Sequence, residues 1–182
     1  MKTKFLGKTN NKSEKKGKNL LDNIPRTKED IKYGFDIWNV YDFMYLDKNM
    51  IPHLAVLEIT IPSNSDFIIE SKSMKLYLNH FYNKSFKTRS EILKIVKKDI
   101  EYKIKSKIKV KFIKSFSKEP AVININKLKL KSSPNKKVLK FNGFRSICPV
   151  TSQPDFASIY IYSDRPIDLK WLKHYLISFS DH

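Results

Sequence analysis

The stretch that decides the fold runs from His53 to Phe81, HLAVLEITIPSNSDFIIESKSMKLYLNHF. Its first ten residues alternate, and one of the two alternating sets is apolar throughout: Ala55, Leu57, Ile59 and Ile61. A period of two predicts a strand over 53–62. After a polar turn and a short apolar run that ends at Glu70, apolar side chains recur at helical spacing: Met74, Tyr77, Leu78 and Phe81. The stretch therefore predicts a strand, a turn and a helix that begins after Glu70.

Downstream patterns extend this strand and helix into an α+β chain. We expect a second helix capped by Ser90, a strand over 107–112 with one basic face, and a strand over 158–162. The second helix would bury Ile92, Ile95, Val96 and Ile100, and a last helix capped by Asp168 would bury Leu172, Tyr175, Leu176 and Phe179.

Between and before these elements the patterns are weaker. Residues 114–140 suggest a weak strand or two inside a long connection, and the aromatic segment 36–46 fits either a strand or an ordered loop. Residues 1 to about 30 resemble a loose arm, although Leu20, Leu21 and Ile24 offer apolar groups that could dock on the body. The second half looks like a partial echo of the first.

Composition restricts the classes of function. The net charge is +18, yet only four of the 36 basic residues are Arg, whose guanidinium is the usual reader of phosphate and guanine. A solvated lysine coat is therefore favoured over a nucleic-acid site, and we expect no direct tRNA binding. No apolar run is long enough to span a bilayer and the N-terminus lacks a secretory pattern, so we expect a cytoplasmic protein and no membrane partner.

Few residues suggest cofactor or metal chemistry by themselves. A single Cys excludes an internal disulfide framework and a multi-cysteine zinc site. The four His are scattered without ligand spacing, so we expect no metal site. With only four Gly, a dinucleotide-binding Rossmann fold is not expected.

Cys148 and Asp155 form one candidate pair for catalysis. Cys148 is followed by Pro149, which suggests a turn, and Asp155 belongs to the compact Gln153-Pro154-Asp155 sequence that leads into a strand. A thiol can attack an electrophile, and a nearby carboxylic acid can protonate the adduct. The alternatives are a buried apolar thiol and a turn residue after proline.

Glu70 has two interpretations as well. An acidic group at the start of a helix is stabilised by the helix dipole, which makes capping the simple one. A carboxylate also accepts two hydrogen bonds from adjacent N–H groups, such as those on the edge of a guanine-like base. Lys72 and Lys75 could meet phosphate, although this signal is weak among so many lysines.

Together these segments resemble the NADPH-dependent 7-cyano-7-deazaguanine reductases, the nitrile reductases of queuosine biosynthesis. The resemblance rests on Ile69 to Asn79, IESKSMKLYLN, and on Cys148 with Gln153-Pro154-Asp155. Further stretches fit the larger, two-module form of that family: Leu6-Gly7-Lys8-Thr9, Ile24-Pro25-Arg26, Asp36-Ile37-Trp38 and Leu176-Ile177-Ser178-Phe179.

The resemblance implies a tunnelling fold related to GTP cyclohydrolase I, with antiparallel sheets backed by helices, and a homodimer. On this basis we expect a basic arm (1–30), a first module (31–113), a connection (114–145) and a partial second module (146–182). It also implies that Cys148 forms a thioimide with the nitrile and that Asp155 donates a proton, with NADPH as the cofactor. Ile69, Glu70 and Ser71 would bind 7-cyano-7-deazaguanine, and Ser71 and Lys72 would contact NADPH.

The sequence also departs from the two-module pattern. The family continues past the Ser-Phe segment into a His-Glu pair that contacts substrate and an Arg-Gly pair that contacts NADPH, whereas this sequence stops at Asp181-His182. Three explanations fit this departure: a fragment, a degraded gene product, or a form that borrows the missing groups from a partner chain. Two other hypotheses stay open at this stage: a non-catalytic purine-binding module and a basic RNA-binding protein.

Overall fold

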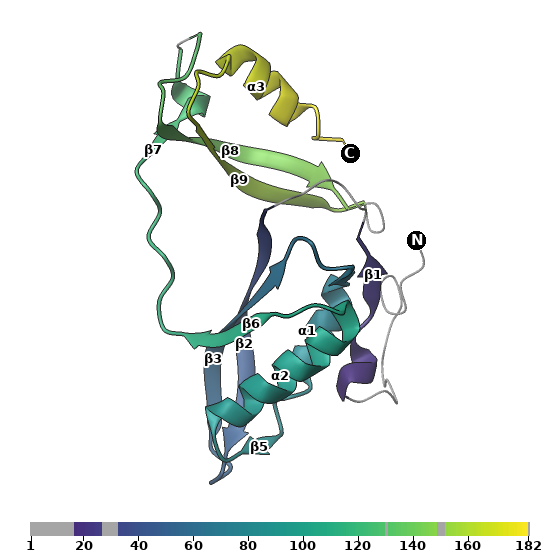
Figure 1. Cartoon of the computed structure of the whole chain (residues 1–182). Coiled ribbons are helices and arrows are strands. Elements are labelled where there is room, and N and C mark those ends of the chain that lie inside the picture. The colour runs from purple at the N-terminus through teal and green to yellow at the C-terminus, as the bar shows by residue number, and fades with distance from the viewer. Residues whose placement is uncertain (1–16, 27–32, 130, 149–151, 182) are drawn as a thin grey trace. The chain divides into compact units, whose positions relative to one another are not determined.

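The computed structural model describes residues 17–26, 33–129, 131–148 and 152–181. The chain divides into two compact units, Met1–Phe116 and Ser117–His182, each with its own hydrophobic core. Both units combine helices with largely antiparallel sheets, so the predicted α+β class is confirmed (Figure 1).

The first unit is built on a four-stranded sheet of order β5-β2-β3-β6. Its long hairpin consists of β2 (Phe35–Asp47) and β3 (Pro52–Pro62), flanked by the short β5 (Ser85–Phe86) and by β6 (Lys109–Ile113). The strand alternative for 36–46 is therefore the correct one. The register of the hairpin shifts between Val40 and Phe43, which places a β-bulge in the middle of β2.

Two helices cover one face of this sheet and close the core. They are α1 (Ser71–Asn79) and α2 (Arg89–Ile104). The alternation predicted for 53–62 is confirmed, because Leu57, Ile59 and Ile61 are buried while Leu54 is 72% exposed. The helical spacing after Glu70 is confirmed too, since the four predicted core residues are all buried: Met74, Tyr77, Leu78 and Phe81.

The N-terminal segment of the described chain docks on this unit. Residues 17–26, which we expected within a loose arm, form a 3-10 helix η1 (Gly17–Leu20) and a strand β1 (Asn23–Pro25). Strand β1 pairs antiparallel with β4 (Phe67–Ile69), and Leu20 and Leu21 are buried as anticipated. Residues 1–16 and 27–30 lie outside the described residues.

Two predictions for α2 are wrong. Its N-cap is Thr88, whose side chain accepts a hydrogen bond from the Glu91 N–H, so Ser90 lies inside the first turn. Ile95 is 41% exposed, and Ile104 is buried with Ile92, Val96 and Ile100 instead. This stripe advances four residues at a time and so drifts away from Ile95, because a helix turns by about 100° per residue.

The second unit has a three-stranded sheet of order β7-β8-β9. Strands β7 (Val122–Asn124) and β8 (Lys137–Ile147) begin in the segment expected to be a connection, and η2 (Ile125–Lys127) lies between them. Strand β9 (Pro154–Ser163) extends the predicted strand at both ends.

The predicted cap of the last helix is confirmed, since the Asp168 side chain accepts hydrogen bonds from Lys170 N and Trp171 N at the start of α3 (Leu169–Ile177). Leu172 and Leu176 are buried as predicted, whereas Tyr175 is 49% exposed and Leu169 is buried instead. Tyr175 lies one turn after Trp171 and stacks on it, with the ring centroids 5.2 Å apart, and both side chains are exposed.

The echo between the halves has a structural counterpart. In each unit a long antiparallel hairpin with one register shift is followed by a helix whose first turn is capped by a carboxylate. The shift lies between Val40 and Phe43 in the first unit and between Asn142 and Phe144 in the second.

The capping of α2 gives a direct test of this fold. Thr88→Ala removes the oxygen that accepts the Glu91 N–H, and we expect the free energy of unfolding to fall by about 1 kcal/mol. Ser90→Ala is the matched control, and its effect should stay within about 0.5 kcal/mol. Urea unfolding of both variants measures the difference. The reverse order of the two effects would contradict the observed helix start.

Candidate functional site

Glu70 lies at the junction between β4 and α1, directly after Ile69. Ile69 is 2% exposed and Glu70 is 4% exposed, so a charged side chain follows the core without reaching far into solvent. The backbone of Glu70 is extended, as the N-cap position of a helix requires. The residues just before Glu70 are held in place because their strand, β4, pairs with β1.

Both carboxylate oxygens of Glu70 serve the start of α1. Oε1 accepts from Lys72 N at 2.8 Å, and Oε2 accepts from Ser73 N at 2.7 Å. The Ser71 hydroxyl donates to Oε1 at 3.4 Å. The capping interpretation of Glu70 is therefore confirmed. A carboxylate offers about four acceptor positions, of which the two amides take two; the other two are open to a ligand when the Ser71 hydroxyl, now at 3.4 Å, turns to another partner.

Ser73 ties this helix start to the N-terminal segment. Its hydroxyl accepts from Asp22 N at 3.0 Å and donates to the Glu70 carbonyl at 2.8 Å, and Ser73 itself is fully buried. The Glu70 N–H in turn donates to the Asp22 carbonyl at 2.9 Å. The Asp22 backbone is thus hydrogen-bonded to both Glu70 and Ser73 at the start of α1. The sequence alone did not predict this contact.

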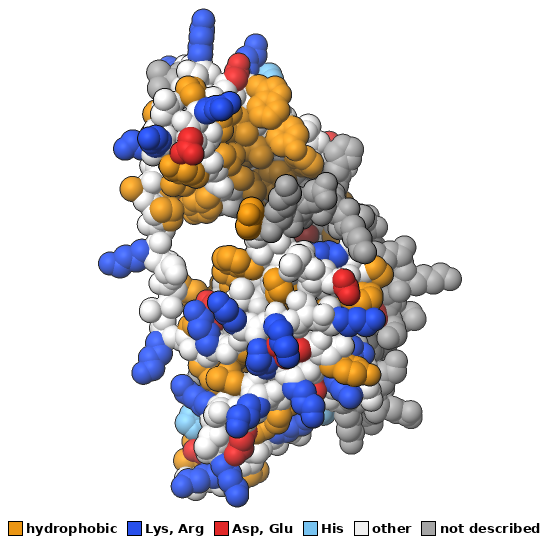
Figure 2. Space-filling model, viewed as in Figure 1, with side chains coloured by type: hydrophobic (Ala, Val, Ile, Leu, Met, Phe, Trp, Pro, Cys, Tyr) orange, Lys and Arg blue, Asp and Glu red, His pale blue; other side chains and the backbone are white. Residues whose placement is uncertain are grey.

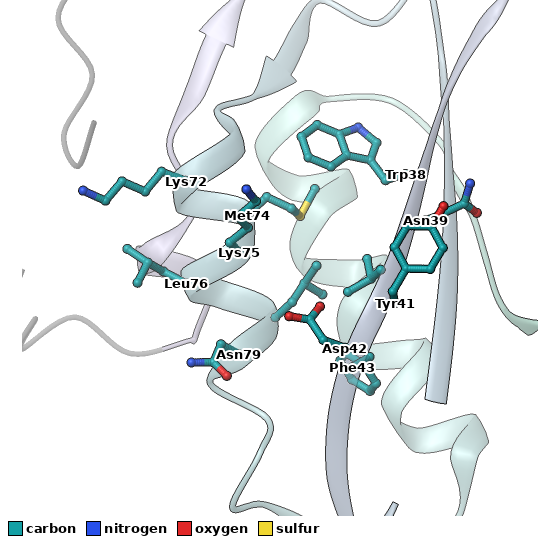
Figure 3. Close-up of a pocket in the computed structure, with 12 residues that line it drawn as sticks. Trp38, Asn39, Tyr41, Asp42, Phe43, Lys72, Met74, Lys75, Leu76 and Asn79 are labelled. Atoms are coloured by element: carbon teal, nitrogen blue, oxygen red, sulfur yellow. The ribbon is translucent and has the colours of Figure 1, made fainter. Parts of the chain in front are cut away.

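A cavity of about 450 Å³ lies beside this helix, between α1 and the β2 bulge. Trp38, Tyr41 and Asp42 line it from β2, and Lys72, Lys75 and Asn79 line it from α1. Figure 3 shows Trp38 and Asp42 reaching from β2 toward α1, while Lys72 extends away from the strand. The aromatic richness of 36–46 was visible in the sequence, but the cavity was not predicted.

Cys148 lies in the second unit, at the end of β8. Its N–H donates to the Gln153 carbonyl at 2.9 Å, and its carbonyl accepts from Ser152 N at 2.9 Å. These bonds close the connection between β8 and β9, so the turn predicted at Cys148 is confirmed. The thiol residue is partly buried. Residues 149–151 of the same connection lie outside the described residues.

Asp155 lies in strand β9 opposite Ser146, so the alternative of a turn residue is wrong. Continuing the register by two residues places Gln153 opposite Cys148, in agreement with their backbone hydrogen bond. Ser146 lies opposite Asp155 and shares its face, and extending the alternation of β8 by two residues, just beyond its end at Ile147, puts Cys148 on that face as well. Asp155 is exposed there.

An aromatic contact and a basic side chain brace this end of the second unit. The Phe144 ring lies 5.8 Å from the Phe179 ring, centroid to centroid. Arg145 donates to the Ser180 carbonyl and lies 3.2 Å from Asp181 Oδ1. The residues after α3 are thus joined to β8 just before the thiol.

The predicted site residues form two groups. Ile69, Glu70, Ser71 and Lys72 follow one another at the start of α1 in the first unit, and Cys148 and Asp155 share one face in the second. Among the described residues no cluster of three or more His, Cys, Asp or Glu could hold a metal ion. None of the described helices has the length and apolarity needed to cross a membrane.

The basic charge is distributed over the surface. Figure 2 shows Lys and Arg side chains scattered over the visible face of the molecule with Asp and Glu between them, without a continuous basic stripe. Several lysines pair with acidic neighbours, including Lys97 with Glu101 at 2.8 Å and Lys111 with Glu58 at 2.9 Å. The pKa of Glu101 lies below its usual value because, although burial opposes ionisation, hydrogen bonds from Lys97 and the Ile108 N–H outweigh it.

Comparison with known proteins identifies relatives over most of the chain. Residues 14–112 match the family model described as nitrile reductase, 7-cyano-7-deazaguanine-reductase N-term. Curated proteins named NADPH-dependent 7-cyano-7-deazaguanine reductase are similar: that of Acinetobacter baylyi is 32% identical over 175 residues (85% of this chain, 65% of the relative). That of Buchnera aphidicola is 34% identical over 179 residues (82% and 66%).

A third relative, from Desulfotalea psychrophila, carries the same name and is 32% identical over 191 residues (92% of this chain, 67% of the relative). The chain spans about two thirds of the length of these curated relatives. The family model covers more than half of the chain, including the whole helical part of the first unit. On this similarity, the chain belongs to the nitrile reductase family of 7-cyano-7-deazaguanine reductases.

Proposed function

We propose that this protein takes part in the NADPH-dependent reduction of the nitrile of 7-cyano-7-deazaguanine to an aminomethyl group. The observation that carries the proposal is the placement of Cys148 and Asp155 on one face at the end of the β8–β9 hairpin, in a chain of this family. A nitrile is a poor hydride acceptor, and addition of a thiol first divides the reaction into easier steps.

The first step forms a covalent bond between Cys148 and the substrate. The Cys148 thiolate donates its electron pair to the nitrile carbon, a carbon–sulfur bond forms, and one carbon–nitrogen π bond breaks. The nitrogen takes a proton from the Asp155 carboxylic acid, which gives a thioimide. All substrate atoms stay on the protein in this step. A partly buried thiol and an exposed acid suit this step, since only the acid must exchange protons with water.

The cofactor would contribute the reducing equivalents: each NADPH would supply one hydride, so the reduction of a nitrile to an amine would use two NADPH molecules in turn. Ser71 and Lys72 are the residues that would hold it. Their chemistry fits such a group, since the hydroxyl of the exposed Ser71 and the ammonium group of Lys72 can both donate hydrogen bonds to phosphate oxygens. Together the two transfers convert the nitrile, with two protons, to the primary amine.

Glu70, Ile69 and Ser71 would recognise the base. Glu is not among the residues usually found at N-cap positions, where the shorter Ser, Thr, Asp and Asn are preferred. Its presence there supports a second task for the carboxylate, namely to accept hydrogen bonds from the ring N–H and exocyclic amino group of deazaguanine. The two amide N–H groups that hold Glu70 would keep both oxygens in a fixed direction. We also expect the tunnelling fold and a homodimer.

The covalent step can be tested without any cofactor. Incubation of the protein with 7-cyano-7-deazaguanine should add the full mass of the substrate to the peptide that contains Cys148, as detected by mass spectrometry. Cys148→Ala should give no adduct. Asp155→Asn should slow adduct formation by on the order of 10²-fold, because a general acid is lost. Substrate binding without an adduct on the wild-type chain would contradict catalysis and favour a purine-binding module.

The role of Glu70 in recognition can be separated from its role as a cap. Glu70→Ser keeps an oxygen that favours N-cap positions but removes the carboxylate. We expect the helix start to survive, while the affinity for 7-cyano-7-deazaguanine falls by at least about tenfold through the loss of charged hydrogen bonds. Calorimetric titration measures affinity, and urea unfolding checks stability. An unchanged affinity in a stable variant would limit Glu70 to capping.

A further inference from the structure

The ion pair between Arg26 and Asp36 has no part in the roles proposed so far. We propose that this pair positions β4, and with it the carboxylate of Glu70, so that Arg26 and Asp36 are positioning residues for the binding of 7-cyano-7-deazaguanine. The inference rests on the proposed function, because that function gives Glu70 its task in recognition of the base.

Strand β4 needs such support because it is short and lies outside the main sheet of its unit. It has three residues and pairs with β1 in a separate two-stranded sheet. Among the described strands, neither β1 nor β4 pairs with the four-stranded sheet β5-β2-β3-β6. The backbone hydrogen bonds of the main sheet therefore do not determine where β4 lies. Since Glu70 follows β4 directly, the place of its carboxylate depends on the other contacts of this small sheet.

Arg26 is bonded to the start of β4 in two ways. Its backbone N–H donates to the Asp66 carbonyl at 3.0 Å. Its side-chain Nε donates to the Ser65 hydroxyl oxygen at 3.4 Å, and the Ser65 hydroxyl in turn donates to the Phe67 carbonyl at 2.9 Å. Ser65 is 4% exposed, so these bonds are largely shielded from water. Through them Arg26 holds both the turn before β4 and the first residue of the strand.

The other branch of the Arg26 guanidinium reaches the main sheet. Nη2 donates to Asp36 Oδ2, and Asp36 belongs to β2, where it lies opposite Ile61 of β3. This ion pair therefore joins the two-stranded sheet to the four-stranded sheet. By contrast, the pair of Lys111 and Glu58 joins two neighbouring strands of the four-stranded sheet, β6 and β3.

The choice of arginine supports a role in orientation. Arg26 is one of four arginines among 36 basic residues. A guanidinium fork can hold two partners in a fixed geometry, whereas a lysine ammonium is a point charge. Ion pairs that are open to solvent contribute little to stability, and the Asp36 side chain is 43% exposed. The pair is thus better suited to orient β4 than to stabilise the fold as a whole.

Strand β4 carries this orientation to the recognition group. Glu70 lies three residues after Phe67, about 10 Å along an extended chain. At that end the Glu70 N–H donates to the Asp22 carbonyl at 2.9 Å. Without the Arg26 contact β4 would still be held at Asp22 but could turn about it, which would change the direction of the Glu70 carboxylate. Hydrogen bonds weaken when their direction is wrong, so the affinity for the base should fall.

The test uses the full chain and calorimetric titration with 7-cyano-7-deazaguanine. Arg26→Gln and Asp36→Asn should each raise Kd about fivefold, since the hydrogen bonds from the base to Glu70 are misdirected but not removed. The double variant should lose no more affinity than either single variant, because both changes remove the same contact. The number of binding sites should stay the same. A purely structural role would instead lower the number of sites and leave the Kd of the folded fraction unchanged.

Three further measurements serve as controls. Arg26→Lys keeps the charge but loses the fork, so Kd should rise only about twofold. Lys111→Gln breaks the ion pair inside the main sheet and should leave Kd within about twofold of the wild-type value. The rate of Cys148 adduct formation at saturating substrate should also stay within about twofold in every variant, because Cys148 and Asp155 are unaltered.

Urea unfolding shows which variants are folded, and the isosteric Asp36→Asn carries the test where Arg26→Gln does not fold. An unchanged Kd in the folded variants, or an equal rise of Kd in Lys111→Gln, would overturn the inference. Additive losses in the double variant would do the same. The wild-type chain tests the proposed function separately: binding and a Cys148 adduct, with an unchanged Kd in the variants, refute the positioning role alone. Absence of both binding and adduct refutes the reductase proposal as well.

Discussion

The carboxylate of Glu70, held by the amides of Lys72 and Ser73, is the contact that fixes the start of α1 in the first unit. It ends one strand and begins one helix, and it is almost fully buried. The Ser73 hydroxyl and the Asp22 backbone hold the same point from the other side. The start of α1 is therefore fixed by hydrogen bonds at one junction, and its direction is fixed by the packing of Met74, Tyr77 and Leu78 in the core.

The hydrogen bonds at this junction bear both on the stability of the start of α1 and on the proposed recognition of the base by Glu70. Burial of a carboxylate costs free energy unless hydrogen bonds compensate for it, and the helix N-terminus supplies both amide donors and a favourable dipole. The same donors would fix the carboxylate in the direction from which it could accept the edge of a base. Glu is uncommon at N-cap positions, and Glu70 would serve both as the cap of α1 and as the group that recognises the base.

The second unit presents the chemistry in a different way. There the thiol and the acid are brought to one face by strand register, since each lies near the end of its strand beside a turn closed by backbone hydrogen bonds. The register of the two strands fixes which face each side chain occupies, because a slip by one residue would move Asp155 to the opposite face. The contact between Phe144 and Phe179 and the bonds from Arg145 to the chain after α3 secure this end of the hairpin.

The sequence by itself determined the α+β class, the strand at 53–62, the helix after Glu70, the cap at Asp168, and the residues that carry the family resemblance. These follow from local periodicity and from capping chemistry, which act over a few neighbouring residues. Tertiary structure decided what local signals do not encode. Thr88 rather than Ser90 caps α2, Ile95 and Tyr175 face outward, and a cavity lined by Tyr41 and Asp42 lies beside α1. Each of these depends on which surface of an element meets its neighbour, and that is settled only when distant segments such as Asp22 and Ser73 come into contact.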